Sequence, residues 1–454
     1  MKYIALAIAK FTFWLNRLTG SGGAALPGLL AKKIDPQILS HLTKGSFPDG
    51  IVVITGTNGK TTVSKLIADT LDSAGVSYVH NKTGSNLERG IISELVRRSD
   101  WRGRVAGNIA LLEVDEASVP AVLSQTGAKI VLVTNLFRDQ LDRYGELQTT
   151  AKMIQRGISS INGATVLLNA DDPLVASLSL GIRGNDVKFY GISDYSGPSL
   201  EHDYTADSNN SPISDSPLKY TKKYFGHMGV YKSENGDFSR PKPDFDLTAM
   251  KKCSVDGSEF GVRSGSSSSA YKLPLPGLYN IYNALSAISV LQMLNIDEKI
   301  TTKSIENSSA AFGRFETFHY MGREIVMVLI KNPTGFNQAI QTYLQGEGGD
   351  PLLLAINDNF ADGRDISWLW DAAIEDIASK HIVVSGLRSY DMALRLKYAD
   401  VKTGAVTVDL AEGLKSLIKQ TKKGERAYIL PTYTAMLSLR KLLVEKTEAE
   451  EYWR

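Results

Sequence analysis

Short apolar runs alternate with segments of helical spacing along most of this chain. In the first half, apolar runs that are typical of buried strands occupy residues 51–54, 110–114, 129–133 and 166–168, and a helical segment covers 61–71. After residue 350, we predict strands at 351–356, 381–385 and 426–430, and helices at 368–379, 389–398 and 434–444. Strands that alternate with helices favour parallel sheets covered on both faces. The pattern therefore predicts an α/β protein with two doubly wound sheets.

A glycine-containing loop joins the first strand to the first helix of this pattern. It reads Thr55-Gly-Thr-Asn-Gly-Lys-Thr-Thr62. Loop amides and a helix N-terminus direct hydrogen-bond donors at a bound polyphosphate. Lys60 is placed to reach the outer phosphates, and the Thr61 hydroxyl is placed to bind Mg²⁺. The sequence predicts an ATP site whose contacts are Thr57, Asn58, Gly59, Lys60, Thr61 and Thr62.

Two other polar groups extend this predicted site. Glu113 ends a buried strand, which is where a carboxylate serves as an Mg²⁺ ligand beside a phosphate loop. Asn280 and Asn283 share one face of the first turn of a predicted helix. Paired amides suit the edge of adenine, whereas a single Asn there would more simply cap the helix.

Composition limits the classes of function that remain. The chain has 454 residues, and 51 Lys and Arg against 49 Asp and Glu leave a net charge of +2. Nucleic-acid binding is therefore not predicted. The single cysteine, Cys253, excludes an internal disulfide and a multi-cysteine metal site. We expect a cytoplasmic protein.

The first twenty residues predict a helix with two possible roles. Lys2, Lys10 and Arg17 share one face of this helix, and apolar side chains such as Phe11 and Trp14 cover most of the rest. Such a helix suits the surface of an anionic membrane, so peripheral contact with the inner face of the plasma membrane is one alternative. Packing of the helix on its own domain is the other.

The phosphate loop resembles that of the Mur ligase superfamily, which forms peptide-type bonds through acyl phosphates. This resemblance implies that Glu113 binds metal and that Asn280 and Asn283 hold adenine. It also implies that Arg314, in the hinge sequence 312–317, reaches phosphate, and it places Lys331 near the γ-phosphate.

The corner that follows the strand at 129–133 also resembles the superfamily. Asn135, Arg138 and Asp139 are expected to line the site. Gln140 replaces the usual histidine of this motif. Imidazole chemistry is therefore not expected at this corner.

Residues 225–244 resemble the ribbon insertion of the MurT family, the synthase subunits of lipid II isoglutaminyl synthases. That ribbon usually carries two zinc knuckles, but Ser211–Ser214 and Ser233–Gly236 stand in their place, and His227 cannot hold zinc alone. We therefore predict no zinc. We expect the ribbon to be held by aromatic packing of Tyr220, Tyr224, Phe225, Tyr231 and Phe238.

The resemblance implies three parts of the chain and a function. We expect an N-terminal helical segment at 1–44, a Mur-ligase-type ATPase domain at 45–313 with an insertion at about 197–245, and a C-terminal Rossmann-like domain at 314–454. The implied reaction is ATP- and Mg²⁺-dependent amidation of the D-glutamate of lipid II, with ammonia from a GatD-type glutaminase. A ligase that adds an amino acid, of Mur or folylpolyglutamate type, and a non-catalytic regulator of a glutaminase remain alternatives.

Two aspartates are candidates for contact with that glutaminase. The resemblance implies that an Asp of this chain completes the partner's Cys–His pair, and Asp365 fits the family's sequence better than Asp362. Asp365 precedes a predicted helix, so it could simply be a helix N-cap. Asp362 precedes a glycine and could simply set a turn.

Overall fold

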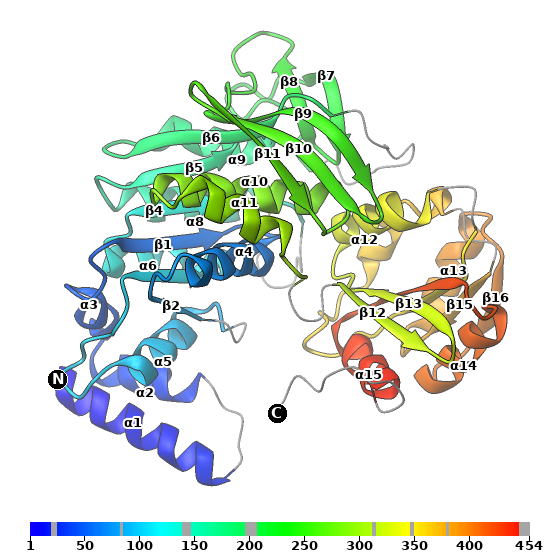
Figure 1. Ribbon diagram of the computed structural model, residues 1–454, viewed down its shortest axis with the longest axis horizontal. Coiled ribbons are helices and arrows are strands. Elements are labelled where there is room, and N and C mark those ends of the chain that lie inside the picture. Colours follow the sequence, from blue (N-terminus) through cyan, green and yellow to red (C-terminus); the bar gives the residue numbers. More distant parts are fainter. Residues whose placement is uncertain are drawn as a thin grey trace.

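The computed structural model describes residues 1–19, 25–81, 85–138, 147–195, 207–310, 315–345, 349–377 and 381–444. The chain begins with three helices, α1 (Lys2–Thr19), α2 (Leu26–Ile34) and α3 (Ile38–Thr43), which lie together at one end of the molecule (Figure 1). Two α/β units follow and lie side by side. The site described below lies where these two units meet.

Within the described residues, the first unit is built on a nine-stranded sheet in the order β11-β10-β9-β6-β5-β4-β1-β3-β2. Its strands are β1 (Gly50–Thr55), β2 (Tyr78–His80), β3 (Ile109–Glu113), β4 (Ile130–Val133), β5 (Thr165–Asn169), β6 (Asp186–Ile192), β9 (Phe245–Ser254), β10 (Gly257–Ser264) and β11 (Ser267–Leu273). Strands β1 to β6 and β9 pair in parallel, and β10 and β11 add an antiparallel edge.

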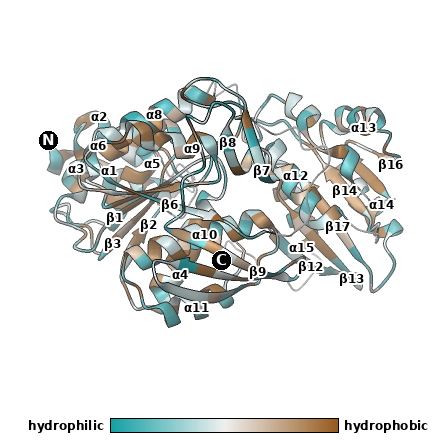
Figure 2. Cartoon of the chain, turned by 90° about the horizontal axis from the view of Figure 1, so that it is seen from above, coloured by the Kyte–Doolittle hydropathy of each residue, from teal (hydrophilic) through white to brown (hydrophobic). Residues whose placement is uncertain are grey.

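Helices cover both faces of this sheet, which explains why its strands are continuous apolar runs. They are α4 (Lys60–Ser73), α5 (Glu88–Arg98), α6 (Val119–Thr126), α8 (Leu147–Ser159), α9 (Pro173–Ser177), α10 (Leu278–Met293) and α11 (Glu298–Glu306). In β1, Val52 and Ile54 belong to the core under α4 and α10, whereas Ile51 and Val53 face the core that α1, α5, α6 and α8 share. Figure 2 shows hydrophobic residues concentrated in the strands between these layers.

The order of the strands fixes the place of the phosphate loop. Strand β3 lies on one side of β1, and the next strand in the chain, β4, lies on the other side. The connections after β1 and β4 therefore diverge, and a crevice opens outside the carboxyl ends of these strands. The loop at residues 55–60 lies at that switch point.

A small hairpin, β7 (Leu218–Phe225) and β8 (Met228–Ser233), forms the described part of the ribbon insertion. Tyr224, Phe225, Tyr231 and Phe238 are buried, as the aromatic pattern predicts, and Tyr231 stacks on Phe238. Tyr220 is half-buried beside Tyr231. The predicted hairpin character and its aromatic packing are confirmed.

The second unit is a six-stranded sheet in the order β12-β13-β17-β14-β15-β16, counted in the described residues. Its elements are β12 (Phe315–Tyr320), β13 (Arg323–Val328), α12 (Pro333–Ala339), β14 (Leu352–Ala355), β15 (Ile382–Ser385), α13 (Ser389–Tyr398), β16 (Thr403–Val406), α14 (Leu410–Gln420), β17 (Arg426–Pro431) and α15 (Tyr433–Val444). All neighbours pair in parallel except β12 with β13. The prediction of an α/β protein with two sheets is confirmed.

The predicted helix at 368–379 is wrong. The chain there forms two short 3₁₀ turns, η4 (Ser367–Asp371) and η5 (Ile374–Asp376), and residues 378–380 lie outside the described residues. Side chains from elsewhere bind the backbone groups that a helix would have used. Asn337 accepts from the Ala373 amide at 2.8 Å, and the Arg395 guanidinium donates to the Ala372 carbonyl at 2.8 Å.

Candidate active site

The phosphate loop is held open by its two glycines and by the corner after β4. Gly56 and Gly59 have φ values of +122° and +89°, which a side chain would strain. A Cβ at Gly59 would also lie 2.1 Å from the Asn283 side-chain oxygen. The Thr57 amide donates to the Asn135 carbonyl at 2.8 Å, and the Asn58 amide donates to the Asn135 side chain at 3.0 Å. The loop is therefore shaped by contacts between β1 and β4.

Lys60 begins α4 and turns back into the loop. Its ammonium donates to the Gly56 carbonyl and lies 2.7 Å from a carboxylate oxygen of Glu116. Both side chains are buried, at 11% and 8% exposure. Burial alone would lower the pKa of Lys60, but Glu116, with further contributions from Glu113 and Asp115, raises it above its usual value. Lys60 is therefore a fixed cation at the bottom of the site.

Two side chains with oxygen atoms that can bind a metal, Thr61 and Glu113, lie where the sequence predicts a magnesium ion. The Thr61 hydroxyl donates to Glu113 Oε1 at 3.0 Å, and Ser64 contacts the other carboxylate oxygen at 3.4 Å. Asn81 fixes the backbone of Glu113 through two hydrogen bonds, at 2.8 and 2.9 Å. Hydroxyl and carboxylate oxygens suit a hard cation. No cluster of three or more His, Cys, Asp and Glu side chains fit for a metal occurs among the described residues. These residues therefore fit Mg²⁺ that takes its other ligands from phosphate and water.

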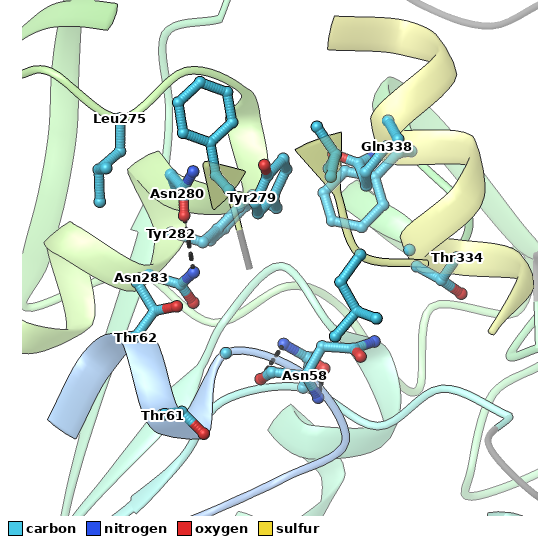
Figure 3. A pocket seen from close by; sticks show the side chains of 18 of the residues that line it. Asn58, Thr61, Thr62, Leu275, Tyr279, Asn280, Tyr282, Asn283, Thr334 and Gln338 are labelled. Carbon is cyan, nitrogen blue, oxygen red and sulfur yellow. Dashed lines mark hydrogen bonds between the residues drawn. The ribbon is translucent and has the colours of Figure 1, made fainter. Parts of the chain in front are cut away.

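A pocket lies above the loop, between the two α/β units (Figure 3). It contains about 980 Å³ of empty space that opens to solvent. Its floor is the start of α4 with Gly59, Thr61 and Thr62, and one wall is the start of α10. Thr334 and Gln338 of α12 line the opposite side. The position of the pocket, above the phosphate loop and between two domains, fits a bound nucleotide.

The asparagine pair lies in this pocket, as Figure 3 shows. The Asn283 amide donates to the Asn280 side-chain oxygen at 3.3 Å, and Asn280 donates to the Pro276 carbonyl at 2.8 Å. The N-cap position of α10 is Gly277, and no side-chain hydrogen bond caps this helix. Neither asparagine therefore serves as its cap. The geometry brings the pair to the pocket.

The apolar lining of the pocket was not predicted from the sequence. Phe137, Phe225, Met228, Leu275 and Tyr282 surround the space above the loop. Two of them come from the ribbon hairpin. Tyr282 could have been predicted to lie at the site, because it stands between the two asparagines in the sequence of α10. No sequence motif indicates that Phe225 and Met228 lie near the phosphate loop.

The ribbon is tied to this pocket by a buried carboxylate. Asp171, after β5, accepts from the Tyr282 hydroxyl at 2.7 Å and pairs with Arg240 of the ribbon at 2.5 Å. Burial raises the pKa of Asp171 despite the attraction of Arg240. The insertion is therefore part of the pocket wall.

Several polar contacts join the two units at the site, and one of them links the hydroxyls of Tyr279 and Tyr343 at 3.3 Å. Asn332 donates to the Asn58 side chain at 3.2 Å. Arg138 lies 3.6 Å from Asp371 and is also paired with Asp207 at the start of the ribbon. Asn135 lines the pocket, and Arg138 connects the ribbon with the second unit. The roles of both residues at the site stay predictions.

Three other residues, Arg314, Asp139 and Lys331, were also predicted to lie at the site. Arg314 and Asp139 lie outside the described residues, so their roles stay predictions. Lys331 is half-buried in the connection between β13 and α12, and it is not among the residues that line the pocket. Its neighbour Asn332 makes the contact with the phosphate loop instead.

The two candidate aspartates of the second unit differ in their surroundings. Asp362 is 8% exposed, and its carboxylate accepts from the Thr434 amide at 2.7 Å and the Thr434 hydroxyl at 2.6 Å, at the start of α15. Asp365 is exposed and accepts from the Ser367 amide at 2.8 Å. Asp362 is thus used within the fold, whereas Asp365 presents its carboxylate to solvent while it caps η4.

Ser211, Ser214 and Ser233 stand at three of the four ribbon positions where the sequence resemblance implies zinc ligands, and Gly236 stands at the fourth. Ser211 and Ser233 donate to one Asp237 oxygen at 2.9 and 2.7 Å. Hydrogen bonds from serines, with Ser214 contributing most, lower the pKa of Asp237. The hydroxyls therefore surround an anion, which was not anticipated. The prediction of no zinc stays a prediction.

Similarity to known proteins covers nearly the whole chain. Residues 54–236 match the Mur ligase middle domain family, and residues 329–436 match the MurT ligase C-terminal family. The subunit MurT of lipid II isoglutaminyl synthase (glutamine-hydrolyzing) from Streptococcus pneumoniae R6 is 36% identical over 96% of this chain and 95% of its own length. The protein of the same name from Staphylococcus aureus COL is 34% identical over 88% of this chain and 89% of its own.

Solved structures with lower identity show the same fold. A pseudomurein peptide ligase type C from Methanothermus fervidus superposes with a TM-score of 0.70 at 21% identity, over 89% of this chain and 80% of its own. MurF ligase from Thermotoga maritima, solved in complex with ADP, gives 0.63 at 13% identity, over 92% and 84%. From the sequence similarity along nearly its full length, this chain belongs to the MurT family of Mur ligases.

Proposed function

We propose that this chain is the ATP-dependent synthase subunit of a glutamine-hydrolysing lipid II isoglutaminyl synthase. The reaction is amidation of the D-glutamate α-carboxylate of the lipid II stem peptide. The names of the Streptococcus and Staphylococcus relatives support it. The observation that carries the proposal is the buried Lys60 in the phosphate loop. Its neighbours Gly59 and Thr61 line a pocket between two domains of a MurT family chain.

The chemistry requires activation because a carboxylate is a poor acyl donor. A carboxylate oxygen attacks the γ-phosphorus of ATP, the bond to the β-phosphate oxygen breaks, and ADP leaves. Ammonia then attacks the acyl carbon, phosphate leaves with the C–O electron pair, and a proton is lost to give the amide. Lys60 binds the charge that develops on the transferring phosphoryl group. Its fixed position means that it needs no reorganisation during the step.

Five further residues complete the proposed nucleotide site. Thr61 and Glu113 would hold Mg²⁺, which supplies charge neutralisation on the phosphates when bound. Arg314, which lies outside the described residues, would bind phosphate, as the resemblance of its sequence to the superfamily hinge implies. Asn280 and Asn283 hold the adenine edge after exchanging their mutual hydrogen bond for bonds to the base.

The second unit offers a docking surface for a GatD-type glutaminase. Leu387, Tyr390, Leu394 and Tyr398 form an exposed apolar stripe along α13. Trp370 of η4 lies against Tyr398, with ring centroids 5.4 Å apart. The stripe is therefore continuous with the turn that Asp365 caps. A partner bound there reaches the Asp365 carboxylate, which suits a third member of its Cys–His pair.

A nitrogen-source assay tests the proposed reaction. Purified protein, ATP, Mg²⁺ and lipid II should release ADP and form the amide with ammonium alone, and with glutamine once the glutaminase subunit is added. Free amino acids should not replace ammonium. Turnover with an amino acid would favour the alternative ligase, and ATP-independent stimulation of the glutaminase would favour the regulatory alternative.

The role of Asp365 has its own test. Asp365→Asn should abolish glutamine-dependent amidation by the complex and keep ammonium-dependent amidation, since the ATP site is untouched. Asp376→Asn, in the neighbouring turn η5, is the matched control and should keep both activities. Loss of both activities in Asp365→Asn would assign Asp365 to the ligase site or to the fold instead.

A further inference from the structure

The N-terminal helix α1 carries an apolar face that is largely exposed among the residues that the structure describes. Ile4, Ile8, Phe11 and Leu15 follow one stripe of the helix, and Trp14 lies beside it. Ile4, Phe11 and Trp14 are 56%, 57% and 55% exposed. Large side chains that are more than half exposed, next to one another, form an interaction patch rather than scattered surface positions.

The opposite face of the same helix is packed in the core. Ala5, Leu6 and Ala9 are fully buried with residues of α2 and α5. Lys10 donates to the carbonyls of Val96 and Ser99 at 3.2 and 2.6 Å, at the C-terminal end of α5. Packing on its own domain, one of the two alternatives from the sequence, is therefore confirmed for one face. The exposed face belongs to a helix that is fixed in place.

The N-terminal segment that carries this patch is basic, and Asp100 is an acidic neighbour of Lys10. The first 34 residues contain five Lys and Arg and no Asp or Glu, although the whole chain has a net charge of only +2. The Lys10 ammonium lies 5.4 Å from the ring centre of Trp101, which is 69% exposed, and Arg102 and Arg104 beside it are also exposed. An apolar face with tryptophans and a basic edge matches an anionic lipid surface.

We propose that the exposed face of α1 docks this chain on the surface of an anionic membrane. The proposal rests on the proposed function in one respect: a substrate that is anchored in the membrane by its lipid requires the enzyme to work at the membrane surface. Within the described residues, no helix is long and apolar enough to cross a bilayer. The chain would therefore lie on the membrane through α1, with Phe11 and Trp14 inserted at the interface.

The position of α1 fits a substrate whose lipid stays in the bilayer. Lys10 ties α1 to the C-terminal end of α5. The N-terminal end of α5 follows Asn86, whose carbonyl accepts from the Asp115 amide at 2.9 Å, just after Glu113. Eleven residues of helix span roughly 16 Å. The docked membrane would thus lie about one helix length from the segment beside the catalytic edge. A headgroup that projects from the bilayer can cover this separation.

Vesicle flotation with the full chain tests the docking. The wild-type protein should float with vesicles of phosphatidylglycerol and phosphatidylcholine, and much less with phosphatidylcholine alone. The triple variant Ile8→Ser, Phe11→Ser, Trp14→Ser should lose at least about tenfold in binding, because three large side chains no longer enter the interface. The matched control is Tyr390→Ser, Leu394→Ser, Tyr398→Ser, which removes a similar stripe from α13 and should float like the wild type.

The outcomes separate docking from catalysis. The α1 variant should keep ammonium-dependent amidation of a water-soluble, lipid-free stem peptide and lose amidation of lipid II in vesicles. Unchanged flotation of the α1 variant would overturn the proposal. A wild-type dimer that the α1 variant converts to monomer would also overturn it, because a second copy would then cover the face. Absence of amidation of either substrate by the wild type would contradict the proposed function and leave the flotation result to stand alone.

Discussion

Replacing Lys60 with Met should separate the catalytic role of this residue from its role in the fold. The ammonium is 2.7 Å from Glu116, and the two side chains are 11% and 8% exposed. Removing one partner of a buried pair leaves an uncompensated charge and costs about 3–5 kcal/mol. For a domain of this size, Tm should fall by roughly 6–10 °C. ATP turnover should fall about 10²–10³-fold or more, because one charged contact to the transferring phosphoryl group is lost.

A second substitution distinguishes the two effects. In the double variant Lys60→Met, Glu116→Gln, no buried carboxylate is left without its cation, so most of the lost Tm should return while ATP turnover stays low. Lys415→Met is the matched control, because Lys415 pairs with Glu412 at 2.6 Å on the surface and both are mostly exposed. It should change neither Tm nor turnover measurably.

The measurements are differential scanning calorimetry and ADP release. The raised pKa of Lys60 means that the pair contributes fully at neutral pH, and that this contribution is lost only as the pH rises past the usual value of 10.5. Near-normal ATP turnover in Lys60→Met would refute the phosphate-loop interpretation. A double variant as unstable as the single one would refute the charge argument.

The structure makes four other predictions. Asp237→Ala should lower Tm at neutral pH. In the wild type, the stability that Asp237 contributes should be lost as the pH falls below the usual pKa of 3.8, because the pKa of Asp237 is lowered in the folded state. Calorimetry at several pH values checks this dependence, and elemental analysis of the purified protein should find no zinc. Asn283→Ala should weaken ATP binding about three- to tenfold by titration calorimetry, through one lost hydrogen bond; unchanged affinity would remove the adenine role. Asp362→Ala should lower stability by about 0.5–2 kcal/mol through loss of the α15 cap, measured by urea unfolding, whereas Asp365→Asn should not. Cys253 should react with iodoacetamide with a midpoint above pH 9.0, because burial raises its pKa, and Cys253→Ser should keep glutamine-dependent activity with the partner.

The sequence by itself determined the features that depend on neighbouring residues. The phosphate loop was predictable because a strand, a loop and a helix that are contiguous in the chain fix its shape. Glu113 was predictable because a residue at the end of a parallel strand must lie at the edge of the sheet that carries the loop. The asparagine pair on α10 was predictable because residues three apart share a helix face.

Only the tertiary structure decided which distant residues meet. Glu116 lies 56 residues from Lys60 in the sequence, and only the fold identifies it as the partner of the lysine. Phe225 and Met228 line the pocket because the ribbon lies against the phosphate loop in the fold. No local sequence pattern predicts this contact between segments that are far apart in the chain. The helix expected at 368–379 is absent because Asn337 and Arg395 bind the backbone of Ala372 and Ala373. Helical spacing predicts a helix only when no side chain from elsewhere in the fold binds its backbone groups.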